Sequence, residues 1–180
     1  MRRTLFESFT LGPLSESLPA PDEAALAELA RNVNHAARIK LGRSLSIRQV
    51  DAGSCNGCEL EIHALGNAFY DLERLGLRFV ASPRHADVLM VTGPVTRNMR
   101  EALLRVYNAT PDPKWVVAVG ACAADGGIFR ESYAVAGGVK DVVPVDLHIL
   151  GCPPSPVELL KGLMALLEGT TNSRAKRRGD

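Results

Sequence analysis

The chain has 180 residues, of which 46% are hydrophobic and 23% are charged, and its formal net charge is +1. This length suits one domain with a sizeable core, and the composition is ordinary for a globular protein. The balanced charge argues against nucleic acid as a partner, because nucleic-acid binding relies on strongly basic surfaces. A basic cluster near the C-terminus is predicted to be a solvated tail: Arg174, Lys176, Arg177 and Arg178.

The sequence contains no predicted membrane span or export signal. The longest apolar run, from Trp115 to Ala124, is far shorter than the roughly 20 residues that cross a bilayer. Arg2 and Arg3 resemble the start of an export signal, but charged residues and prolines interrupt the segment after them. We therefore expect a cytoplasmic protein, in which grouped cysteines more often bind metal or perform redox chemistry than form structural disulfides.

The N-terminal region differs in pattern from the rest of the chain. Residues 1–21 contain three prolines and little periodicity, which predicts an extended arm. Residues 22–40 place apolar side chains at helical spacing, which predicts an amphipathic helix. This helix either docks on a neighbouring subunit or packs on its own domain. We expect three regions: the arm and helix (1–44), an α/β domain (45–169) and the basic tail (170–180).

From residue 45 onward, short apolar runs alternate with helical patterns. Nearly continuous apolar runs are typical of parallel strands that are covered on both faces. The predicted fold is therefore an open, mostly parallel α/β sheet of flavodoxin-like order. The predicted strands are 45–50, 77–81, 86–92, 115–120 and 145–150, and the predicted helices are 57–75, 97–108 and 156–168.

Capping residues mark where these helices begin and end. Asn56 with Glu59 three residues later predicts a capping box, and so does the segment 155–158, which also places proline at the first helical position. Gly76 and Gly169 are expected to end their helices. One face of the first core helix is predicted to carry Ile62, Leu65, Phe69 and Leu72.

Each cysteine follows a predicted strand and has a glycine close by. Cys55 and Cys58 form the segment S-C-N-G-C after the first strand, whereas Cys122 and Cys152 follow the fourth and fifth strands. Ligand sites in open α/β sheets lie at the carboxyl ends of the strands. We therefore expect the four cysteines to meet at one edge and to form a single thiolate site.

Four interpretations of these cysteines compete. A single C-x-x-C fits zinc or a thioredoxin-like redox pair, but a redox pair leaves Cys122 and Cys152 unexplained. Zinc sites with four cysteines usually combine two short-spaced pairs, unlike this pattern. Unligated buried cysteines are a third interpretation. A cluster with four cysteine ligands fits best, and four thiolates suffice for one such iron–sulfur cluster.

Five ordered segments, spread over residues 45–168, resemble one protein family. The family is the small, cluster-bearing subunit shared by respiratory complex I and energy-converting, membrane-bound [NiFe]-hydrogenases. The matching segments are S-C-N-G-C-E-L-E at 54–61, S-P-R-H-A-D-V-L-M-V-T-G-P-V-T at 82–96, G-A-C-A at 120–123, G-G-I-F at 126–129 and G-C-P-P-S-P at 151–156.

The resemblance implies a cofactor and a branch of the family. In that family, the cysteines that match Cys55, Cys58, Cys122 and Cys152 ligate one [4Fe–4S] cluster. The resembling complex I members carry two adjacent cysteines where this chain has Cys55 and Cys58 separated by two residues. The spacing therefore resembles the hydrogenase branch, in particular the small subunits of formate hydrogenlyase and CO-linked hydrogenases.

The implied function is an electron relay within an oxidoreductase complex. The cluster would pass electrons between a ferredoxin-like iron–sulfur subunit and a catalytic large subunit that holds the nickel–iron site. The chain would sit at the cytoplasmic face of the membrane, attached through integral membrane subunits. The alternatives are a complex-I-type subunit whose cluster reduces quinone and, without enzymatic activity, a zinc-stabilised assembly module.

Several further residues carry expectations. Glu61 is either a proton relay near the cluster or a structural carboxylate, and the segment 123–144 is predicted to wrap the cluster and contact the large subunit. Asp125 is expected to bond the backbone of the Cys122 loop. The residues to which ordinary structural roles are assigned are His63, Arg84, His85 and His148.

Overall fold

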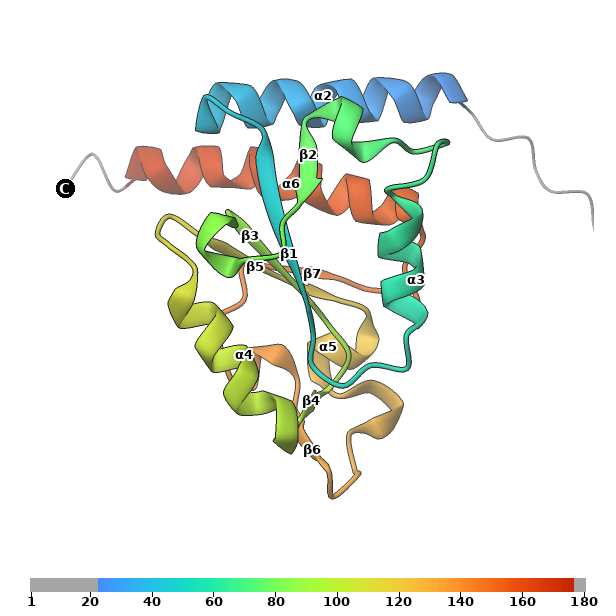
Figure 1. Cartoon of the computed structure of the whole chain (residues 1–180), viewed down its shortest axis with the longest axis vertical. Coiled ribbons are helices and arrows are strands. Elements are labelled where there is room, and N and C mark those ends of the chain that lie inside the picture. The colour runs from blue at the N-terminus through green and yellow to red at the C-terminus, as the bar shows by residue number, and fades with distance from the viewer. Residues whose placement is uncertain (1–22, 177–180) are drawn as a thin grey trace, which may run out of the picture.

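The computed structural model describes residues 23–176, and these form an open sheet with helices on both faces (Figure 1). All pairings within the five-stranded sheet are parallel, and the order β2-β1-β3-β5-β7 is the predicted flavodoxin-like one. The predicted arm at 1–21 and residues 177–180 of the tail lie outside the described residues. The strands are β1 (Leu45–Asp51), β2 (Leu77–Phe79), β3 (Val88–Thr92), β5 (Trp115–Val119) and β7 (Leu147–Ile149).

Side chains alternate between two apolar clusters along the central strands. In β3, which is buried throughout, Val88 and Met90 pack into one cluster, whereas Leu89 and Val91 pack into the other. This alternation follows from the two-residue period of a strand. Helices α2 (Glu23–Leu41), α3 (Gly57–Ala64) and α6 (Pro156–Lys176) contribute to the first cluster, and α4 (Arg97–Ala109) contributes to the second.

The amphipathic helix α2 packs on its own domain. It lies alongside α6 across the top of the view in Figure 1. Val33 is fully buried in the first apolar cluster, and Leu29 and Ala36 pack against that cluster. Of the two interpretations of this helix, packing within the domain is therefore the one that the structure displays.

The predicted helix at 57–75 is wrong in its length. Helix α3 ends at Ala64, and the 3₁₀-helix η1 (Leu72–Leu75) follows after a turn. The Oδ1 of Asn67 accepts hydrogen bonds from the N–H groups of Phe69 and Tyr70, which replaces helical bonding in this turn. Phe69 is consequently 44% exposed instead of facing the core.

The last helix, α6, passes through the glycine that was expected to end it. It begins at Pro156, as predicted, and continues to Lys176, so residues 170–176 of the predicted tail are helical. Gly169 lies inside this helix, because one glycine costs only about 1 kcal/mol there and does not by itself break the hydrogen-bonding pattern. Gly76 does not end the predicted helix over 57–75, which stops at Ala64, but it caps the separate 3₁₀-helix η1 with a left-handed φ of 76°.

The structure also contains short elements that the sequence did not predict, most of them near the carboxyl end of the sheet. Strands β4 (Val95–Thr96) and β6 (Val135–Gly137) form a two-stranded antiparallel sheet. The remaining elements are α5 (Ala121–Asp125) and the 3₁₀-helices η2 (Pro83–His85), η3 (Gly127–Phe129) and η4 (Val139–Asp141). None of the helices within residues 23–176 is long and apolar enough to cross a membrane.

Candidate metal centre

All four cysteines follow the carboxyl ends of strands in the parallel sheet. Cys55 lies in the loop after β1, and Cys58 lies in the first turn of α3. Cys122 lies in α5 directly after β5, and Cys152 follows β7. Because neighbouring parallel strands end at the same edge, the topology gathers these loops as predicted.

Backbone contacts hold the three cysteine loops against one another. The N–H of Ala121, beside Cys122, donates to the carbonyl of Gly151, beside Cys152, at 2.8 Å. A β-carbon placed on Gly57, between Cys55 and Cys58, would lie 3.8 Å from the Cδ of Pro153. The loop after β7 therefore contacts both of the other cysteine loops.

Two cysteine sulfurs lie where the side chain of a larger residue would be, beside Gly120 and Gly127. Gly120 has a φ of 88°, and a β-carbon there would lie 2.6 Å from the Sγ of Cys58. Gly127 has a φ of 52°, and a β-carbon there would lie 2.8 Å from the Sγ of Cys122. Both positions combine a left-handed backbone with a lack of space, so larger residues are excluded on two grounds.

The first cysteine loop is ordered by polar contacts, but the predicted capping box is absent. The Oδ1 of Asp51 accepts hydrogen bonds from Gly53 and Ser54 at 2.7 and 2.8 Å. Asn56 occupies the N-cap position with a φ of 72° and makes no capping hydrogen bond. A side-chain cap usually requires an extended backbone, and the left-handed conformation of Asn56 prevents it.

The thiols differ in exposure and influence one another electrostatically. Cys55 and Cys152 are exposed, whereas Cys58 and Cys122 are partly buried. Burial raises the pKa of Cys58 to about 11, and the neighbouring Glu59 carboxylate and the other three thiols add to this rise. Burial also raises the pKa of Cys122, as do Cys152 and Cys55. Within residues 23–176, no three His, Cys, Asp or Glu side chains gather closely enough to hold a single metal ion.

Glu59 is a buried carboxylate that the sequence interpretation assigned wrongly. It is 5% exposed, and neither carboxylate oxygen has a hydrogen-bond partner. It lies three residues before Ile62 on the buried face of α3. This i, i+3 spacing was visible in the sequence, because the predicted apolar face of the helix continues backward from Ile62 to position 59.

The other titratable residues singled out by sequence lie nearer the surface. Glu61 is only partly buried, which leaves both of its predicted roles open. His63, Arg84, His85 and His148 are exposed, and their side chains make no hydrogen bond or ion pair with other described residues. The salt bridges or caps expected of Arg84 and His85, and the satisfied hydrogen bonds expected of His63 and His148, are therefore not formed with the described residues.

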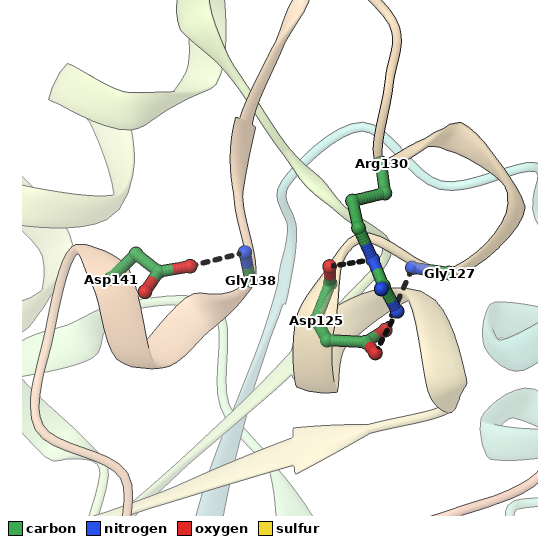
Figure 2. A network of polar contacts seen from close by, with 5 residues as sticks. All are labelled: Asp125, Gly127, Arg130, Gly138 and Asp141. Atoms are coloured by element: carbon green, nitrogen blue, oxygen red, sulfur yellow. Dashed lines mark hydrogen bonds and ion pairs between the residues drawn. The ribbon is translucent and has the colours of Figure 1, made fainter.

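Two aspartates, Asp125 and Asp141, make the polar contacts that hold the segment after Cys122 in shape (Figure 2). Asp125 forms an ion pair with Arg130 and accepts a hydrogen bond from the N–H of Gly127 at 3.0 Å. Further along, the carboxylate of Asp141 accepts a hydrogen bond from the N–H of Gly138 at 2.8 Å. The expectation that Asp125 bonds the backbone of this loop is confirmed.

Large apolar side chains are exposed close to the cysteines in sequence. Ile128 and Tyr133, in the segment after Cys122, are 84% and 88% exposed. Leu60 follows Cys58 by two residues and is 62% exposed, whereas Leu150 precedes Cys152 by two residues and is 66% exposed. These four side chains are therefore available for contact with another protein.

A cavity of about 300 Å³ lies directly beside Cys55. Its walls come from the first cysteine loop and from the segment that leads into β6. Pro94, Phe129 and Val135 make part of this wall apolar. The segment after Cys122 and the loop that carries Cys55 therefore face each other across this cavity.

The parallel sheet, with cysteine loops at its carboxyl edge, is typical of a redox subunit, and comparisons with known proteins agree. Residues 55–166 match the family described as NADH ubiquinone oxidoreductase, 20 Kd subunit, and the chain belongs to this family of oxidoreductase subunits. The matched range begins at Cys55 and includes all four cysteines. It confirms the resemblance inferred from the motifs.

Two relatives are named as subunits of a formate hydrogenlyase and of a membrane-bound hydrogenase. Formate hydrogenlyase subunit 7 of Escherichia coli is 48% identical over 138 residues, which cover 75% of this chain and 54% of that protein. The chain thus matches about half of that relative's length. A probable membrane-bound hydrogenase subunit, mbhJ, of Pyrococcus furiosus is 48% identical over 128 residues, which cover 71% of this chain and 77% of that protein.

A solved structure shows the same fold in a larger assembly. It is described as the membrane-bound sulfane sulfur reductase, an archaeal respiratory membrane complex. One of its chains is 35% identical to this chain with a TM-score of 0.66, and the match covers 81% of this chain and 78% of that chain. The α/β fold predicted from the sequence is therefore confirmed by an independent comparison.

Proposed function

We propose that this chain is the electron-transfer subunit of a membrane-bound [NiFe]-hydrogenase complex. Its single [4Fe–4S] cluster would be held by Cys55, Cys58, Cys122 and Cys152. The observation that supports this most strongly is that three separate cysteine loops meet at one edge of the sheet. At Gly120 the absence of a side chain leaves room for the Sγ of Cys58. When bound, such a cluster accepts and releases one electron at a time.

The residues present suit this group in number and in kind. Four thiols from three loops provide a complete ligand set for one cluster. The bare backbone at Gly120 and Gly127 leaves room beside two of the sulfurs. The raised pKa of Cys58 means that this thiol holds its proton in the metal-free chain, and metal binding would displace it.

We propose three kinds of partner subunit for this chain. The exposed apolar side chains Ile128 and Tyr133 would meet the catalytic large subunit, which would hold the nickel–iron site. A ferredoxin-like iron–sulfur subunit would exchange electrons with the cluster, and integral membrane subunits would attach the assembly to the cytoplasmic face of the membrane. The membrane-bound complexes named among the relatives support partner subunits in general.

A complex-I-type role is the second candidate, and the cavity beside Cys55 favours it. Its volume of about 300 Å³ and its apolar wall would suit part of a hydrophobic electron acceptor such as a quinone. The two-residue separation of Cys55 and Cys58 favours the hydrogenase branch instead. A zinc-stabilised assembly module is the third candidate, and metal analysis separates it from both.

Glu61 is proposed as a proton relay that accompanies electron transfer. It lies one helical turn beyond Cys58 on α3 and is only partly buried, so it can exchange protons with a neighbouring subunit. Glu61→Gln keeps the shape of the side chain but removes the titrating group, and it should slow proton-linked turnover. Turnover equal to that of the wild type would remove Glu61 from the mechanism.

Single cysteine-to-serine variants in the assembled complex test the relay. Each of the four variants should lower the iron content of this chain and should slow the reduction of the large subunit by a chemically reduced donor. Ser82→Ala, which removes a hydroxyl that makes no capping hydrogen bond and lies outside the cysteine loops, is the matched control. Full iron content and full electron transfer in any one cysteine variant would show that the cysteine in question is not a ligand.

A further inference from the structure

A second cavity, of about 290 Å³, lies between α3 and the strands β1 and β2. Arg48 and Gln49 of β1 form one wall, and Ile62 and His63 of α3 form another. The end of β2 and the chain just after it, including Ala81, close a third side. No cysteine lines this cavity, so the site and the cysteine centre do not share a wall.

The cavity borders a length of β1 that has no strand beside it. β1 pairs with β3 from Ile47 to Asp51, but it pairs with β2 only from Leu45 to Ile47. The last contact on the β2 side is the hydrogen bond from the N–H of Val80 to the carbonyl of Ile47 at 2.9 Å. An unpaired strand edge of this kind offers backbone donors and acceptors to another extended chain.

The ionisable side chains that line the cavity are all basic. Arg48 and His63 line it, and no aspartate or glutamate does. The Nε of Arg48 is buried and has no hydrogen-bond partner, and no described carboxylate forms an ion pair with this residue. An arginine that is partly buried without an acceptor costs free energy, which an incoming carboxylate would recover through charge-assisted hydrogen bonds.

The size of the cavity limits its occupant. Pockets for drug-sized ligands and cofactors occupy about 300–1,000 Å³, and this cavity lies at the lower limit of that range. It has room for one acidic side chain together with the backbone that carries it. We propose that this cavity binds an extended, acidic segment of a partner subunit, whose backbone pairs with the edge of β1 and whose carboxylate meets Arg48 and His63.

Photo-crosslinking in the assembled complex tests the proposal. A photoreactive amino acid at Ala81, an exposed position on the cavity rim, should crosslink to a partner-subunit peptide in which an aspartate or glutamate is near the attachment point. The same group at Ala109, which is exposed at the end of α4, is the control and should not capture that peptide. Capture of lipid alone, of a peptide without acidic residues, or of nothing would overturn the proposal.

Two pairs of variants isolate the contribution of charge. Arg48→Gln should lower the crosslink yield by about tenfold, the loss of one charge-assisted hydrogen bond, and Arg48→Lys should lower it less. Gly66 also lines the cavity, and a β-carbon there would make only an ordinary contact, 3.5 Å from the carbonyl of His63. Gly66→Glu can therefore supply a competing carboxylate and should lower the yield more than Gly66→Gln. If the crosslink yield fell equally in Arg48→Gln and Arg48→Lys, and equally in Gly66→Glu and Gly66→Gln, the results would contradict a site for a carboxylate.

The proposal rests on assembly of this chain into a complex and does not depend on the cluster. Iron content should be unchanged in the Arg48 and Gly66 variants, because the cavity that both residues line includes no cysteine. Failure of the crosslink with full iron content would reject the acidic-segment site alone. Loss of iron from the cysteine variants with an intact crosslink would leave this site standing.

Discussion

A β-carbon built on Gly120 would lie 2.6 Å from the Sγ of Cys58, so the backbone after β5 and a thiol at the start of α3 are in direct contact. These two residues are 62 positions apart in the chain, and the parallel sheet brings them together. The contact exists only because position 120 has no side chain. It joins the first cysteine loop to the loop that carries Cys122.

Gly120→Ala should therefore displace Cys58 and lower the iron bound per chain severalfold. The left-handed φ of 88° adds a conformational cost of about 1–2 kcal/mol for any residue with a β-carbon. Iron analysis after anaerobic purification measures the first effect, and urea unfolding measures the second. Gly169→Ala is the matched control, because a β-carbon there meets nothing within 4 Å and should leave the iron content unchanged.

Glu59→Met should stabilise the metal-free chain. The wild-type carboxylate is buried with neither oxygen hydrogen-bonded, and such a group costs about 1–3 kcal/mol. Methionine has a similar volume and no polar oxygen, so the free energy of unfolding should rise by an amount of that order. Glu61→Met on the same helix, at a partly exposed position, should change it by less than about 0.5 kcal/mol. Destabilisation by Glu59→Met would show that the carboxylate has a structural partner.

The double variant Ile128→Ser and Tyr133→Ser should weaken binding to the large subunit by at least about tenfold. Both side chains are largely exposed, and burying such groups in an interface contributes roughly 1.5–3 kcal/mol for each large apolar residue. Co-purification and a binding titration measure the change. Ile39→Ser, at a position on α2 that is 71% exposed, is the control for loss of an exposed apolar group. If Ile39→Ser weakened binding to the large subunit as much as the double variant does, the surface around Ile128 and Tyr133 would be rejected as the interface.

Acid should remove the contribution of the cap at the start of α6. The backbone N–H of Ser155 and then its hydroxyl donate to Glu158, which lowers the pKa of that carboxyl below its ordinary value of 4.5. A carboxyl with a lowered pKa stabilises the folded state above its unfolded pKa and loses this effect as the pH falls through the folded value. Wild type should therefore have a higher Tm than Glu158→Gln at pH 7, and the difference should shrink below about pH 4.5. A difference that stays the same from pH 7 down to the lowest pH at which the protein still folds would contradict this account.

The sheet was predictable from sequence, because its order depends on patterns that are local to each strand. Continuous apolar runs marked the strands, and their alternation with helices limited the connections to a parallel arrangement. The capping box at Ser155 and Glu158 was also predictable, and both of its hydrogen bonds form. The cysteine edge followed from the sheet, since the loops after parallel strands gather at one end.

The errors arose where side-chain bonding or backbone conformation overrides periodicity. The Oδ1 of Asn67 bonds the N–H groups two and three residues later and ends the α3 pattern early. Asn56 adopts a left-handed φ, so a sequence that matches a capping box makes no cap. The cavity beside Arg48 exists because β2 stops pairing with β1 at Ile47. No local pattern in the sequence predicts the residue at which this pairing ends.

The central claim is that four cysteines hold one four-iron cluster in this chain. The most direct test is metal analysis of the anaerobically purified complex, combined with electron paramagnetic resonance of the reduced sample in wild type and in the Cys122→Ser variant. The account predicts a signal from a reduced four-iron cluster that is present in the wild type and lost in the variant. Zinc bound to this chain in place of iron, or a spectrum that the variant leaves unchanged, would contradict it.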